Sequence, residues 1–138
     1  MARHEINLKQ LKVRELMRSE LKVIQAHENV GKAVQYLWAN DVQSVAVLKD
    51  GDFMGLITSQ DMAKIIMQLF AGKGDTPVEN YIAKQDLITI SPDIPLQEFI
   101  HKLDSTHAIC LPVIENDKIV GTLSSRDIMH YIANLTDN

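Results

Sequence analysis

The heptapeptide "GLITSQD" at residues 55–61 is written a second time, as "GTLSSRD" at residues 121–127. Aligned on this phrase, residues 45–61 face residues 111–127 without a gap. Both stretches run from an apolar segment through a polar turn to a glycine, hydroxyl residues and an acid. Self-similarity at a fixed displacement is typical of a duplicated structural unit. The phrase therefore predicts that the chain folds as two similar copies.

The match extends over almost all of the 138 residues. Leu21 aligns with Leu87 in the same register, whereas "VRELM" (13–17) aligns with "VENYI" (78–82) after a slip of one residue. One copy alone would bury too little surface to be stable, so the copies are expected to pack around a pseudo-twofold axis. The predicted organisation is an N-terminal extension at 1–12, a first repeat at 13–71, a linker at 72–77 and a second repeat at 78–134.

Each copy predicts the order strand, helix, strand, strand, helix, which is an α+β fold. The predicted first strands are 21–26 and 87–91, and the first helices show apolar residues at helical spacing within 30–38 and 96–103. Two β-rich runs then meet at the polar turns "KDGD" (49–52) and "ENDK" (115–118). The last helix of each copy is expected to open at or just before the acid of the repeated phrase.

The corner between the last strand and the last helix combines a hydroxyl with an acid: Thr58 and Asp61 in the first copy, Ser124 and Asp127 in the second. The first turn of a helix attracts anions such as phosphate, and hydroxyls add donors. A carboxylate can accept hydrogen bonds from two ribose hydroxyls. The same residues are also good helix N-caps, each worth ~1 kcal/mol, so capping and ligand binding both stay open. Gly55 and Gly121 leave room for a close backbone or ligand approach.

Composition excludes several classes of function. A hydrophobic content of 46% is that of a globular protein, and the formal net charge of −4 provides no basic surface for nucleic acid. Cys110 is the only cysteine, so we expect a reducing compartment, the cytoplasm, and a buried inert thiol. No apolar stretch approaches the ~20 residues of a membrane span. We expect a soluble protein without nucleic-acid or membrane partners.

Neither catalysis nor metal binding is indicated. The chain has no phosphate-binding glycine loop, and no Ser-His-Asp grouping has meaningful spacing. The five histidines (4, 27, 101, 107 and 130) form no metal-ligand pattern and are interpreted as solvated or half-buried. His130 follows Arg126 by one helical turn and is a candidate phosphate contact. We therefore predict no enzyme, no catalytic residue and no metal.

With its two copies of the phrase, the chain resembles a tandem pair of CBS domains, a Bateman module, over roughly residues 13–133. The resemblance rests on "VRELM", "SVAVLKDGDFMGLITSQDM" and "LPVIENDKIVGTLSSRDIM". It implies AMP, ADP or ATP bound in two clefts between the repeats, with phosphate and ribose contacts from Thr58, Asp61, Ser124 and Asp127. It also implies, more loosely, adenine contacts near Val23, Ile24, Ser44, Ile88, Thr89 and Ala108.

The two copies differ in the residue that precedes the acid of the repeated phrase. Arg126 precedes one acid and Gln60 the other, so the second corner is expected to bind phosphate more tightly. Two more positions differ: Ala46 stands where the other copy has Pro112, and Ala33 where it has Phe99. Four cations precede the first strands: Arg14, Arg18, Lys22 and Lys84. Those cations are either solvated or available to neutralise phosphate.

The function predicted from the sequence is a regulatory module that senses an adenosine nucleotide, without a cofactor. The resemblance implies a homodimer. The output is expected to act in trans, on an enzyme or transporter, or through the oligomeric state. Two alternatives stay open. One is a ligand-free module for dimerisation or docking, and the other is a binder of S-adenosylmethionine or NAD(H).

Overall fold

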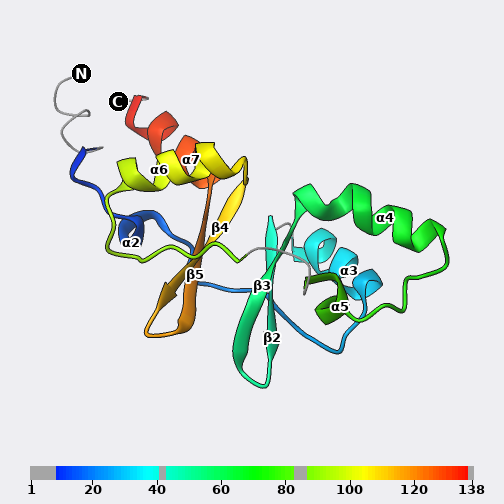
Figure 1. Cartoon of the computed structure of the whole chain (residues 1–138). Coiled ribbons are helices and arrows are strands. Elements are labelled where there is room, and N and C mark those ends of the chain that lie inside the picture. The colour runs from blue at the N-terminus through cyan, green and yellow to red at the C-terminus, as the bar shows by residue number, and fades with distance from the viewer. Residues whose placement is uncertain (1–8, 41–42, 83–86, 137–138) are drawn as a thin grey trace. The chain divides into compact units, whose positions relative to one another are not determined.

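The computed structural model describes residues 9–40, 43–82 and 87–136. Contacts divide the chain into two compact units (Figure 1). We call Leu21–Leu87 the central unit, and the remainder, up to Glu20 and from Ile88 onward, the terminal unit. The terminal unit thus combines residues from both ends of the sequence. The repeat boundaries expected from the sequence, 13–71 and 78–134 with a linker at 72–77, stay a prediction.

The central unit is a three-stranded sheet with helices. Its elements are β1 (Val23–Gln25), α3 (Val30–Asn40), β2 (Ser44–Lys49), β3 (Asp52–Thr58), η1 (Ser59–Asp61), α4 (Met62–Phe70) and α5 (Val78–Ile82). Strand β2 pairs with β1 in parallel and with β3 antiparallel. Asp50 and Gly51 both have positive φ, which is the two-residue turn that suits a β-hairpin. Ile24, Val45, Val47, Ile57 and Ile65 are fully buried in its core.

The terminal unit repeats this plan. Its elements are α2 (Val13–Leu16), α6 (Leu96–Thr106), β4 (Cys110–Glu115), β5 (Lys118–Ser124) and α7 (Ser125–Thr136). Strands β4 and β5 form an antiparallel hairpin whose turn residues, Asn116 and Asp117, also have positive φ. Val13, Ile90, Phe99, Val113 and Leu123 lie in its core, and Cys110 is buried, as expected.

The predicted strand at 87–91 is wrong in extent. Only Ile90 bridges to β4, where it pairs with Val113. In the central unit the N–H of Ala46 donates to the carbonyl of Lys22 (2.8 Å) and lengthens the parallel ladder. Pro112 stands at the position of Ala46 and has no N–H to donate, so the matching hydrogen bond is impossible. The proline therefore shortens this ladder to a single bridge.

The short leading helices are exchanged between the copies. Helix α2 comes from the first copy in the sequence but belongs to the terminal unit, and α5 comes from the second copy but belongs to the central unit. The segment after α2 pairs with β5, because Arg18 and Thr122 exchange two backbone hydrogen bonds of 2.8 and 2.9 Å. A Cβ at Gly121 would lie 2.6 Å from the carbonyl oxygen of Arg18. The glycine of the repeated phrase thus permits this close approach.

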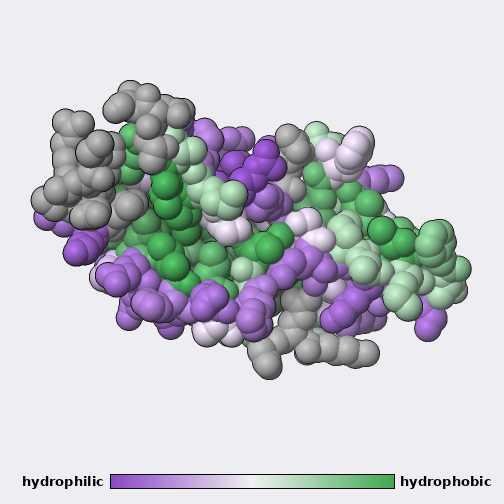
Figure 2. All heavy atoms as spheres, turned by 90° about the horizontal axis from the view of Figure 1, so that it is seen from above, coloured by the Kyte–Doolittle hydropathy of each residue, from purple (hydrophilic) through white to green (hydrophobic). Residues whose placement is uncertain are grey.

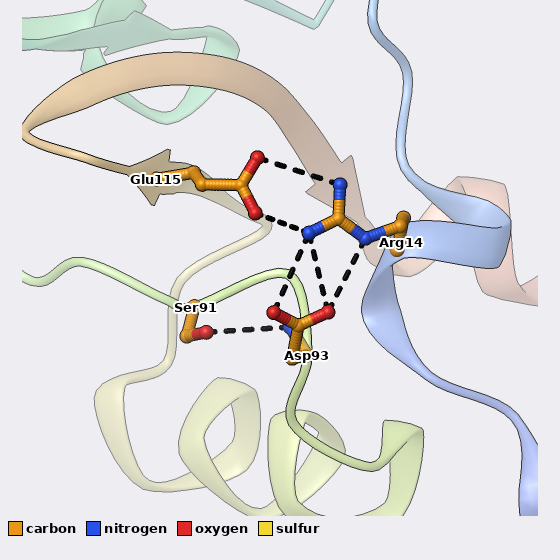
Figure 3. Close-up of polar contacts among 4 residues, drawn as sticks. All are labelled: Arg14, Ser91, Asp93 and Glu115. Carbon is orange, nitrogen blue, oxygen red and sulfur yellow. Dashed lines mark hydrogen bonds and ion pairs between the residues drawn. The ribbon is translucent and has the colours of Figure 1, made fainter.

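Ion pairs link each leading helix to the hairpin of the unit in which it lies. Arg14 on α2 lies between Asp93 and Glu115 and donates to both carboxylates (Figure 3). The hydrogen bonds to Glu115, and to a smaller extent those to Asp93, raise the pKa of Arg14. In the central unit, Glu79 on α5 pairs with Lys49 of β2 at 3.6 Å. The matching positions therefore carry the same pair with the signs reversed.

Large apolar side chains remain exposed on the helices. Trp38 at the end of α3 and Phe70 at the end of α4 are 86% and 88% exposed, and Met67 is also exposed. Figure 2 shows this hydrophobic surface on the α4 side of the central unit. In the described part of the chain, no helix combines the length and the apolar character needed to cross a bilayer.

Candidate functional site

The corner of the terminal unit is built around Ser124 and Asp127. Ser124 is the last residue of β5 and is 4% exposed, and Asp127 lies in the first turn of α7. Oxygen Oδ2 of Asp127 accepts hydrogen bonds from the backbone N–H of Ser124 (3.0 Å) and from its hydroxyl (2.8 Å). The hydroxyl in turn accepts from the N–H of Asp127 at 3.1 Å. This reciprocal arrangement is a capping box, and it fixes the direction of the carboxylate.

The corner of the central unit repeats the box with Thr58 and Asp61. The N–H of Thr58 donates to Oδ2 of Asp61 at 2.7 Å, and its hydroxyl lies 3.4 Å from the same oxygen. The hydroxyl also accepts from the N–H of Gln60 at 3.2 Å. Thr58 is 8% exposed. In both units the hydroxyl points to its own acid, so capping is the role that the structure displays.

The exchanged leading segments supply a donor for the other oxygen of each acid. Arg18 Nε donates to Oδ1 of Asp127 at 2.7 Å, and the hydroxyl of Tyr81 donates to Oδ1 of Asp61 at 2.8 Å. Sequence reasoning missed Tyr81, because it aligns with the apolar Leu16 of the other copy. It noted Arg18 only as a cation near a strand. The two corners therefore share a carboxylate design but differ in the charge of the neighbouring donor.

The other predicted site residues of the central unit lie at the same end of its sheet. Ser44 is the register partner of Thr58, and Val23 pairs with Ala46 two residues further along β2. Val23 and Ser44 are half-buried. The side chain of Ile24 is fully buried in the core.

In the terminal unit, Ile88 and Thr89 are exposed and directly precede the bridge at Ile90. Ala108 is half-buried just before β4. The neighbouring Ile109 accepts a hydrogen bond from the N–H of Ser125 at the start of α7 (3.0 Å). This contact ties the entry of β4 to the corner.

The basic residues that were candidates for phosphate contacts have different surroundings. Arg126 is exposed in the first turn of α7, and no hydrogen bond or ion pair engages it within the described ranges. Arg14 forms ion pairs with Asp93 and Glu115 (Figure 3), so its charge is already paired within the terminal unit. Lys84 lies outside the described residues.

The described residues contain no group of three or more His, Cys, Asp or Glu side chains placed to hold a metal ion. Both ring nitrogens of His130 lie near the side-chain amide of Asn134, at 3.3 and 3.4 Å. His130 is exposed on α7.

Comparison with known proteins identifies the family. The profile of the CBS domain matches this chain twice, over residues 13–68 and 78–134. The chain belongs to the CBS-domain family. The two matches start at Val13 and Val78, where the leading helices α2 and α5 begin.

One curated relative matches this chain along nearly its whole length. A CBS domain-containing protein of Methanocaldococcus jannaschii is 30% identical over 127 residues, which cover 90% of this chain and 97% of that protein. An A-adding tRNA nucleotidyltransferase of Aquifex aeolicus is 28% identical over 88% of this chain, but the match covers only 14% of that enzyme. The chain spans between 14% and 25% of the first three curated relatives that it matches.

Solved structures of CBS-domain proteins share the fold. One CBS domain pair, solved with 5′-methylthioadenosine and S-adenosyl-L-methionine, has a TM-score of 0.76 at 20% identity and covers 91% of this chain and 98% of its own. A CBS-domain protein solved in complex with AMP has a TM-score of 0.73 at 18% identity, with the same coverage of 91% and 98%. At this level of identity the likeness establishes the fold alone.

Proposed function

We propose that this protein is a non-catalytic regulatory module that binds an adenosine nucleotide at its two Ser/Thr–Asp corners. The observation that carries the proposal is the repeated capping box, which holds a carboxylate in a fixed direction at the start of a helix in each unit. AMP, 5′-methylthioadenosine and S-adenosylmethionine, which the neighbouring structures contain, share an adenosine with two adjacent ribose hydroxyls. Such a diol is a natural donor to a carboxylate.

Each residue of a corner then has a distinct role. Asp61 and Asp127 accept hydrogen bonds from the ribose hydroxyls, while Thr58 and Ser124 orient the carboxylates. Arg126 supplies the positive charge for phosphate in the terminal unit. The adenine is proposed to lie near the positions named above: Val23, Ile24 and Ser44 in one unit, and Ile88, Thr89 and Ala108 in the other.

Calorimetry and thermal unfolding with a series of ligands test this proposal. AMP, ADP and ATP are expected to bind and to raise the melting temperature, because a ligand of the folded state stabilises it by mass action. Guanosine nucleotides should bind more weakly. The 2′,3′-dideoxy analogue of the best ligand should lose most of its affinity, because it cannot donate to the carboxylates. If S-adenosylmethionine or NADH binds instead, the ligand class is corrected and the ribose contact is retained.

A second function, protein docking, is favoured by the exposed apolar helices. Ile66, Met67 and Phe70 are exposed on α4, Met129 is exposed on α7, and Trp38 is exposed on α3. We propose that these helices form a homodimer, and that the module acts in trans on an enzyme or transporter. Light scattering over a range of concentrations should give twice 15.5 kDa. A monomer at every concentration excludes the homodimer, and a dimer without heat from any adenosine compound favours the docking function alone.

A further inference from the structure

The acceptor capacity of Asp127 sets a limit on what this corner can bind. An ionised carboxylate offers about four lone-pair positions. In the described part of the chain, hydrogen bonds from the N–H of Ser124, the hydroxyl of Ser124 and Nε of Arg18 already end on Asp127. Two ribose hydroxyls need two positions. A diol can therefore be accepted in full only if a present donor leaves.

Arg18 is the donor that can leave. Ser124 is buried and its two contacts form the capping box, so breaking them would uncap α7. The side chain of Arg18 is 60% exposed, whereas that of Asp127 is only 10% exposed. The backbone of Arg18 is fixed beside β5 by its two hydrogen bonds with Thr122. Its guanidinium can therefore change partner while its Cα stays beside the corner.

We propose that Arg18 gives the terminal-unit corner a preference for phosphorylated adenosine ligands over neutral ones. This inference rests on the proposed function and deepens it. A neutral nucleoside would replace a charge-assisted hydrogen bond on Asp127 with neutral donors, which is an unfavourable exchange. A nucleotide brings phosphate oxygens that pair with the released guanidinium, so the charged bond is replaced and not lost. Arg18 thereby selects for phosphate through competition for the ribose acceptor.

The central unit provides an internal comparison. The matching donor to Asp61 is the hydroxyl of Tyr81, which carries no charge. Gln60 also stands there in place of Arg126. Neither Tyr81 nor Gln60 carries the positive charge that Arg18 and Arg126 bring to the terminal corner. We expect it to distinguish ATP from adenosine much less than the terminal corner does.

The test compares adenosine and ATP by calorimetry on the full chain. Asp61→Asn serves as the background, because it weakens the central corner and isolates the terminal one. Adding Arg18→Gln should strengthen adenosine binding and weaken ATP binding, so that the ratio of the two affinities falls by at least about tenfold. Arg14→Gln removes an equal charge from the same leading segment, yet Arg14 is held by Asp93 and Glu115. That control should leave the ratio unchanged.

Each result decides the matter. An unchanged ratio in Arg18→Gln, or an equal loss of both ligands, overturns the role of Arg18 and leaves the proposed function standing. Binding that is present in wild type but absent in the Asp61→Asn background shows that the terminal corner is not the site, and overturns the inference alone. If wild type binds no adenosine compound, the proposed function falls and the inference falls with it. Thermal unfolding of every variant confirms that it is folded at the temperature of the titration.

Discussion

Replacing Gly121 by alanine tests how closely the leading segment approaches β5. The new Cβ would lie 2.6 Å from the carbonyl oxygen of Arg18 and 3.0 Å from the sulfur of Met17. The methionine side chain can move, but the carbonyl is held by the N–H of Thr122 at 2.9 Å. The contact can be relieved only if the backbone of Arg18 shifts away from the strand.

The expected cost follows from these contacts. Forcing an extra methyl group into a packed interior typically costs about 1–3 kcal/mol. The shift also weakens the two backbone hydrogen bonds between Arg18 and Thr122, each worth about 1 kcal/mol. We therefore expect Gly121→Ala to lower the free energy of unfolding by roughly 2–4 kcal/mol. At about 4 °C per kcal/mol for a chain of this length, the melting temperature should fall by about 8–16 °C.

Urea unfolding followed by circular dichroism measures this loss, with Gly31→Ala as the matched control. A Cβ at Gly31, inside α3, would meet its nearest atom, Oδ1 of Asn29, at 3.4 Å. Alanine is the better helix former there and should be neutral or stabilising by roughly 0.5 kcal/mol. A Gly121→Ala protein within about 0.5 kcal/mol of wild type, the range of ordinary surface substitutions, would refute the packing of Arg18 over this glycine.

Three other predictions concern the corners and the ion pairs. Asp127→Ala should weaken the tightest nucleotide binding seen in calorimetry more than Asp61→Ala does; the opposite order would assign the tight site to the central unit. Arg126→Gln should flatten the preference among AMP, ADP and ATP, because it replaces a charged donor to phosphate by a neutral one; an unchanged preference would remove Arg126 from the site. A double-mutant cycle on Lys49 and Glu79 should give a coupling free energy of about 0.2–1 kcal/mol that decreases with salt; zero coupling at low salt would show that the pair contributes nothing.

The hairpins and long helices were predictable because their signals are local. The turns "KDGD" and "ENDK" stand between apolar runs, and the structure places positive φ at residues 50–51 and 116–117. The periodic segments within 30–38 and 96–103 lie in helices α3 and α6. The helix N-cap at each corner was also predicted from residue type alone. These features depend on residues close in sequence, which is why one sequence sufficed.

Contacts between distant segments were harder to foresee. The difference between Ala46 and Pro112 was visible, but its effect on the strand before Ile90 depends on a parallel pairing across more than twenty residues. The donors to the two acids, Arg18 and Tyr81, lie far from Asp127 and Asp61 in the sequence. No local pattern indicates which side chain a carboxylate will meet after the leading helices are placed. The corner was therefore predicted from its own residues, and its neighbours were not.

The charges on the leading helices give a physical reason for the exchange. Arg14 and Glu79 occupy matching positions in "VRELM" and "VENYI", and Lys49 and Glu115 match in the two hairpins. In the observed arrangement Arg14 meets Glu115 and Glu79 meets Lys49.

If each leading helix packed on the hairpin of its own copy, Arg14 would face Lys49 and Glu79 would face Glu115. Like charges at both contacts would disfavour that arrangement, while the observed one has two attractive pairs. Each exposed pair contributes little by itself, but the difference between attraction and repulsion acts at two places and in the same direction. The sign reversal thus favours the packing that brings Arg18 to Asp127 and Tyr81 to Asp61.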